Sequence, residues 1–122
     1  MQLSILRGLW PSAAAAALAG LLTGAVASYA VTGPPEASAT IDNFTFAPAQ
    51  LTVKTGTTVI WRNEDDIPHT VSSSTRLFRS KALDTDDSFS FTFTAPGTYE
   101  YFCSLHPRMT ATIVVEPGNA AK

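Results

Sequence analysis

Near its carboxyl end the chain reads Cys103-Ser104-Leu105-His106-Pro107-Arg108-Met109, which spaces a thiol, an imidazole and a thioether at three-residue intervals. The chain has 122 residues with one Cys, two His and two Met, and one of the two Met is Met1. Its soft-ligand side chains are therefore these three and the second histidine, His69. We interpret the heptapeptide as a tight loop between two strands, in which one ligand ends the first strand and another begins the second.

These four side chains indicate a metal site. Thiolate and thioether groups prefer soft or borderline metals, and two imidazoles with one thiolate and a weak axial Met form a blue-copper ligand set. We therefore predict Cys103 as a thiolate ligand, His69 and His106 as neutral imidazole ligands, and Met109 as the axial ligand. A buried free Cys, a structural His and a core Met are ordinary alternatives for each residue alone, but the joint pattern favours one copper ion.

Two other chemistries use some of the same residues. Zinc binds Cys and His readily, but Met109 is a poor fourth ligand for it. A nucleophilic enzyme built on Cys103 and His106 needs a third group to orient the base and an oxyanion hole, and no candidate for either stands out in the sequence. We expect a protein that is not an enzyme.

Short alternating apolar runs follow residue 39 and are separated by Pro and Gly turns, which is typical of an all-β sandwich or barrel. One single helical turn between Thr75 and Lys81 is compatible with the pattern. Side chains alternate between faces along a strand, so an inward Cys103 places Tyr101 inward with it. The runs are residues 44–46, 51–54, 59–62, 89–93, 98–103 and 110–115.

The amino-terminal residues 1–30 have the pattern of a signal peptide, with Arg7 before an apolar run of small residues at 13–27. Taken from Ala13 to Val31, the run is also close to the roughly 20 residues that a membrane-spanning anchor helix needs. We expect a signal peptide or membrane anchor over 1–30, a flexible linker over 31–38, one domain over 39–117 and a tail over 118–122. The segment contains no Arg-Arg pair, so it does not indicate twin-arginine export.

The charge balance excludes one class of partner. Without Arg7 the remaining chain has seven Lys and Arg against ten Asp and Glu, a net charge of −3. Nucleic-acid binding proteins present a basic face, so we expect no nucleic acid. The acidic clusters at Glu64-Asp65-Asp66 and Asp84-Thr85-Asp86-Asp87 are solvated loops or a rim that contacts a basic redox partner.

Residues 39–116 resemble the cupredoxins, and within them the plastocyanin-like and amicyanin-like proteins. The resemblance rests on the heptapeptide of residues 103–109, on Val59-Ile60-Trp61-Arg62-Asn63, and on Ile67-Pro68-His69-Thr70-Val71. It implies a two-sheet Greek-key β-sandwich with one type 1 copper ion. It also implies that Asn63 helps to tie the two ligand loops together. Two positions depart from the family: Thr70 where Asn is frequent, and Ala111 where Gly is frequent.

The resemblance further implies an exported, periplasmic or otherwise extracytoplasmic protein that carries single electrons by cycling between Cu(II) and Cu(I). The alternative is a copper storage or delivery protein without an electron-transfer role. We expect a monomer whose redox partner, a cytochrome, dehydrogenase or oxidase, docks near His106. Apolar residues flank the two histidines there, and Phe102 offers a second contact. Membrane association depends on an uncleaved leader.

Overall fold

The computed structural model describes residues 20, 24–25 and 33–118. The chain divides into two units, Met1–Val31 and Thr32–Lys122, and the β-strands described below lie in the second. The predicted signal or anchor helix falls almost entirely outside the described residues, so it stays a prediction. Among the described residues there is no helix with the length and apolar character needed to cross a membrane.

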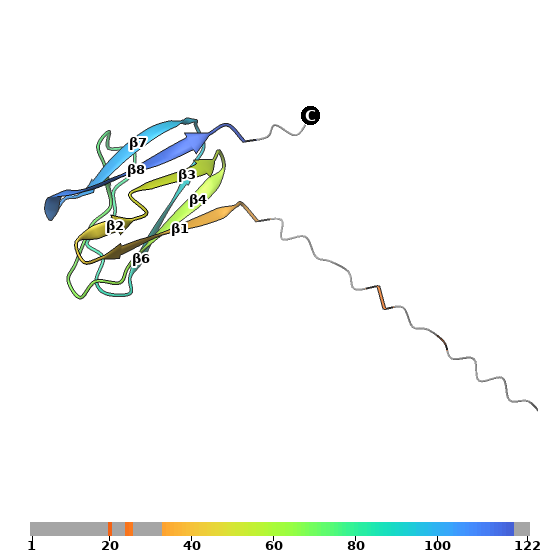
Figure 1. Ribbon diagram of the computed structural model, residues 1–122, viewed down its shortest axis with the longest axis horizontal. Helices are drawn as coiled ribbons and strands as arrows, with labels where there is room; N and C mark the ends of the chain where they lie inside the picture. The colour runs from red at the N-terminus through yellow and green to blue at the C-terminus, as the bar shows by residue number, and fades with distance from the viewer. Residues whose placement is uncertain (1–19, 21–23, 26–32, 119–122) are drawn as a thin grey trace, which may run out of the picture. The chain divides into compact units, whose positions relative to one another are not determined.

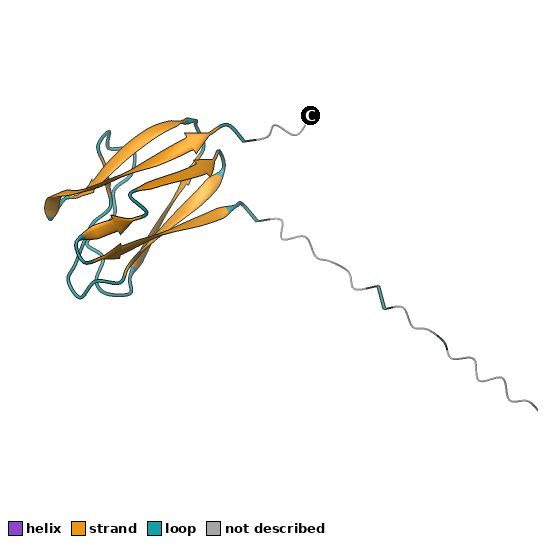
Figure 2. Cartoon of the chain, in the orientation of Figure 1, coloured by secondary structure: helices purple, strands orange, loops and turns teal. Residues whose placement is uncertain are grey.

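The described part of the second unit consists of strands and loops (Figures 1 and 2), which confirms the prediction of an all-β, two-sheet fold. One four-stranded sheet has the order β2-β1-β4-β6 and the other the order β3-β8-β7-β5. The strands are β1 (Glu36–Asp42), β2 (Thr45–Ala47), β3 (Gln50–Lys54), β4 (Thr57–Asn63), β5 (Ser72–Ser73), β6 (Ser88–Phe93), β7 (Gly97–Cys103) and β8 (His106–Glu116).

Each sheet contains one parallel pair of strands. In the first sheet β1 runs parallel to β4, and in the second β3 runs parallel to β8. The first strand begins at Glu36, within the stretch 31–38 predicted as a linker. The Pro and Gly residues of this stretch and its lack of apolar periodicity suggested a linker. In the structure, however, Glu36 pairs with Thr58, and the Pro35 carbonyl accepts the Thr58 N–H at 2.8 Å. Pairing with β4 therefore extends the strand in spite of its composition.

The core lies between the two sheets and follows the predicted alternation of side chains. Trp61 is fully buried on β4, and Tyr101 on β7 meets it edge to face at 5.5 Å between ring centroids. On β8 the alternate residues from Met109 onward are all buried: Met109, Ala111, Ile113 and Val115. Residues two apart on a strand share a face, so these strands present one continuous apolar surface to the core.

The segment between β5 and β6 differs from the single helical turn considered for residues 75–81. It forms a loop in which Ser72 bridges Arg79 and the Phe78 carbonyl accepts the Ser73 N–H at 2.9 Å. This loop turns Phe78 into the core, where its ring lies 4.9 Å from that of Phe91 and 5.7 Å from that of Trp61. Burial of one aromatic side chain in the core therefore fixes the loop.

Two neighbouring residues of this loop allow a matched test. Phe78 is 4% exposed and Leu77 is 51% exposed. We expect Phe78→Ala to lower the free energy of unfolding by about 3–5 kcal/mol, because it leaves a cavity among aromatic rings. Leu77→Ala should change it by no more than about 0.5 kcal/mol. Urea unfolding of both variants in the same metal state measures the difference, and equal losses would show that Phe78 does not anchor the loop.

Candidate metal centre

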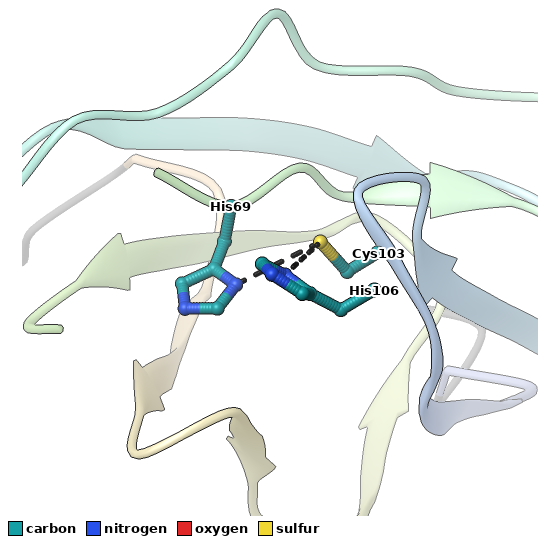
Figure 3. A group of neighbouring side chains, drawn as sticks. All are labelled: His69, Cys103 and His106. Carbon is teal, nitrogen blue, oxygen red and sulfur yellow. Dashed lines mark hydrogen bonds between the residues drawn. The ribbon is translucent and has the colours of Figure 1, made fainter. Parts of the chain in front are cut away.

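Three predicted ligands converge from one end of the sandwich (Figure 3). Cys103 ends β7 and His106 begins β8, and these two residues pair across the strands with an irregularity in register at Phe102 and Cys103. His69 comes from the loop after β4, where its N–H donates to the Leu83 carbonyl at 3.1 Å and its carbonyl accepts from the Leu83 N–H at 2.7 Å. Backbone pairing thus fixes all three residues.

The ligand atoms face one point. The Cys103 Sγ lies 3.7 Å from His69 Nδ1 and 3.7 Å from His106 Nδ1, and all three atoms lie within 4.8 Å of one another. His69 and Cys103 are fully buried, whereas His106 is partly exposed. One soft and two borderline donors at these distances fit a single copper ion. Met109, 6% exposed, lies three residues after His106 on β8.

The surroundings of Cys103 favour its thiolate. Desolvation on burial would by itself raise the pKa of the thiol, but hydrogen bonds, the largest of them from the Thr70 N–H, outweigh it and lower the pKa to about 6. The thiolate is the form of Cys that binds metals. These hydrogen bonds therefore favour the form of the sulfur that binds a metal.

An aspartate that the sequence did not single out orients His69. Asp65 is 8% exposed, and its Oδ2 lies 2.9 Å from His69 Nε2. Hydrogen bonds from the Phe44 N–H and the His69 ring lower the pKa of Asp65 to about 2. Because an ionised carboxylate can only accept, Nε2 carries the proton in the neutral imidazole, which leaves the Nδ1 lone pair facing Cys103. Asp65 therefore selects the tautomer that can bind a metal.

Asn63 shapes the loop that carries His69. Its amide donates to the Ile67 carbonyl at 2.8 Å and to the Leu83 carbonyl at 2.9 Å, and its Oδ1 accepts the Asp65 N–H at 3.0 Å. The sequence predicted that Asn63 ties ligand loops together. In the structure its side chain binds the His69 loop to the segment around Leu83, and the link to the Cys103 loop comes from another residue.

Thr70 supplies that second link. Its N–H donates to the Cys103 sulfur at 3.3 Å, and its Oγ1 accepts the Ser104 N–H at 2.7 Å. The Thr70 and Ser104 hydroxyls are also 2.8 Å apart. The departure from the family at Thr70 therefore keeps the contact between the loops. At Ala111 the backbone is regular strand and φ is not positive, so a Cβ is accommodated.

Phe44 covers both imidazoles, a role that its alternation with Phe46 did not predict. It is 52% exposed, and its ring meets His69 at 5.6 Å and His106 at 5.0 Å, edge to face in both cases. Its φ of 57° turns the chain between β1 and β2, and its N–H donates to Asp65 Oδ2 at 3.0 Å. Leu105, also 52% exposed, adds a second apolar side chain next to His106.

Comparisons with known proteins agree with this geometry. Residues 13–115 match the family model described as "Cupredoxin-like domain". The chain is 32% identical over 81 residues to amicyanin of Paracoccus versutus, which covers 62% of this chain and 61% of that protein, less than two thirds of its length. It is 30% identical over 109 residues to amicyanin-alpha of Methylorubrum extorquens, which covers 85% of this chain and 92% of that protein.

Among solved structures, the chain is similar to a purple cupredoxin from Nitrosopumilus maritimus. The identity is 33% and the TM-score 0.63, with 66% of this chain and 99% of that chain covered. The fold, the grouped His and Cys side chains and the family match over residues 13–115 lead to one conclusion. The chain belongs to the cupredoxin family.

Proposed function

We propose that this protein is a blue copper protein that carries single electrons between redox partners, with one type 1 copper ion held by His69, Cys103, His106 and Met109. The observation that carries the proposal is the convergence of two imidazole Nδ1 atoms and one thiol sulfur within 4.8 Å. When bound, copper supplies the one-electron change between Cu(II) and Cu(I). The amicyanin relatives support this assignment.

The residues around the site hold the ligands in one arrangement. Thr70 fixes the position of the Cys103 sulfur, and Asp65 fixes the orientation of the His69 ring. Both supports are buried, so they rearrange little when the charge at the site changes. A site of this kind favours electron transfer over the alternative of copper storage or delivery, which needs ligands that open to release the ion.

We propose a carrier and not an enzyme, and the amicyanin relatives support this proposal. The His106 edge is partly exposed, so it is the part of the His and Cys group that reaches the surface. The exposed Phe44 and Leu105 lie beside it and offer a small apolar contact surface. Transient redox complexes use small interfaces. A cytochrome, dehydrogenase or oxidase would dock there against a monomer, and the net negative charge argues against nucleic acid.

We also propose an extracytoplasmic, periplasmic location. The support is the small-residue apolar run at 13–27 and the presence of amicyanins among the relatives. Residues 1–30 then act as a signal peptide or as a membrane anchor, ahead of the copper domain over 39–117.

The first test of this function is Cys103→Ser. We expect the copper-loaded protein to absorb intensely in the visible range because of thiolate-to-Cu(II) charge transfer, and the variant to be colourless. Ser104→Ala serves as the control, since Ser104 is exposed and keeps its N–H bond to Thr70. Reversible voltammetry of the native chain distinguishes the carrier from a storage protein. A blue Cys103→Ser variant would contradict the ligand assignment.

Met109 should affect the reduction potential more strongly than it affects the affinity for the metal. We expect Met109→Leu to raise the potential, because Cu(II) loses a donor that it needs more than Cu(I) does. Met109→Gln should lower it, because a harder oxygen ligand favours Cu(II), and both shifts should be on the order of tens of millivolts or more. Voltammetry measures both. Potentials unchanged in the two variants would place Met109 in the core alone.

Asp65 should affect the reduction potential through its contact with His69 and through its negative charge. Asp65→Asn removes a buried negative charge that stabilises Cu(II), so we expect the reduction potential to rise by on the order of tens of millivolts. Asp66→Asn removes the same charge from an exposed neighbour, where solvent and salt screen it, and should have a smaller effect. Voltammetry of the two variants at neutral pH compares them. Equal shifts would mean that the contact with His69 has no role.

A further inference from the structure

A hollow of about 540 Å³ is lined by residues of β5, of the loop that follows β5 and of the end of β7, the strand that ends in Cys103. Its lining includes Ser72, Ser73, Arg76, Arg79, Phe102 and Ser104. Binding pockets for small molecules commonly have volumes of about 300–1,000 Å³ and combine an apolar wall with a few polar groups. Phe102 supplies such a wall, and none of the lining residues is a proposed copper ligand.

The charge in this hollow is positive and unbalanced. Arg76 and Arg79 both line it, and no Asp or Glu does. Within the described residues the Lys and Arg ion pairs are Lys54 with Glu116 and Arg62 with Asp86, so neither lining arginine has a carboxylate within 4 Å. Guanidinium groups bind carboxylates and phosphates with two parallel hydrogen bonds. In a chain with a formal net charge of −2, two free arginines in one concavity mark a local site for an anion.

The loop geometry keeps Arg76 beside the hollow. Ser73 holds the turn, since its Oγ accepts the Thr75 N–H at 3.2 Å and its carbonyl accepts the Arg76 N–H at 3.1 Å. Arg76 has a φ of 65°, which a non-glycine residue seldom adopts. Arg79 is fixed from the other side by its backbone bridge to Ser72.

We propose that this hollow binds a small oxyanion of the polycarboxylate or phosphate class, with its oxygens on Arg76 and Arg79. The anion's remaining atoms lie against Phe102. Binding needs no metal, so a failure of anion binding leaves the proposed copper function intact, and a failure of copper binding leaves this site intact.

The test is titration of the full chain with citrate and, separately, with inorganic phosphate, followed by calorimetry and by NMR of backbone amides. We expect saturable binding of one equivalent, with shifts at Ser73, Phe102 and Ser104. The citrate and phosphate arms distinguish a polycarboxylate from a phosphate. Saturation by neither anion, or shifts centred elsewhere, would overturn the proposal.

Variants locate the site. Arg76→Gln and Arg79→Gln should each raise the Kd about tenfold, because each loses one charge-assisted contact. Arg108→Gln removes the same charge from an exposed arginine outside the hollow and should leave the Kd unchanged. Equal effects of all three variants would mean non-specific attraction and would overturn the site.

Discussion

The Cys103 sulfur lies fully buried at the end of β7, where a charged thiolate is costly unless neighbouring groups compensate it. Thr70 compensates this charge in part by donating its N–H to the sulfur. Thr70 is in turn held by Ser104, the residue after Cys103. The loop after β4 and the turn between β7 and β8 therefore stabilise each other through the Cys103 sulfur and through the hydrogen bond between Ser104 and Thr70.

Much of the fold was predictable from local periodicity. Alternation in residues 59–62, 98–103 and 110–115 indicated strands, and the parity of Cys103 with Tyr101 was confirmed. The strand at Glu36 was not predictable, because its pairing partner on β4 lies far along the chain and its own composition resembles a linker. Phe78 was missed for a related reason, since a loop residue becomes part of the core only when distant strands form the space around it.

The site was predictable where residue type alone decides the chemistry. Cys103, His69 and His106 were grouped from their donor atoms, and the structure brings those atoms together. The sequence did not show that Asp65, and not Glu64 or Asp66, contacts His69, because three adjacent acidic residues give the same sequence signal. The side chain of Asn63 decides which one turns inward, by accepting the Asp65 N–H. Phe44 was read as part of a strand because a turn with positive φ leaves no periodic signal.

The strand order also sets a sequence of events during synthesis. All members of the sheet β2-β1-β4-β6 are complete once Phe93 has been made, whereas β3 pairs with β8, the last strand of the described chain. Pairings between distant segments form slowly, since the loop must close before the contacts can form. Cys103 and His106 lie on the final two strands. A growing chain therefore acquires the thiol and the second histidine of the site only after all four strands of the first sheet have been made.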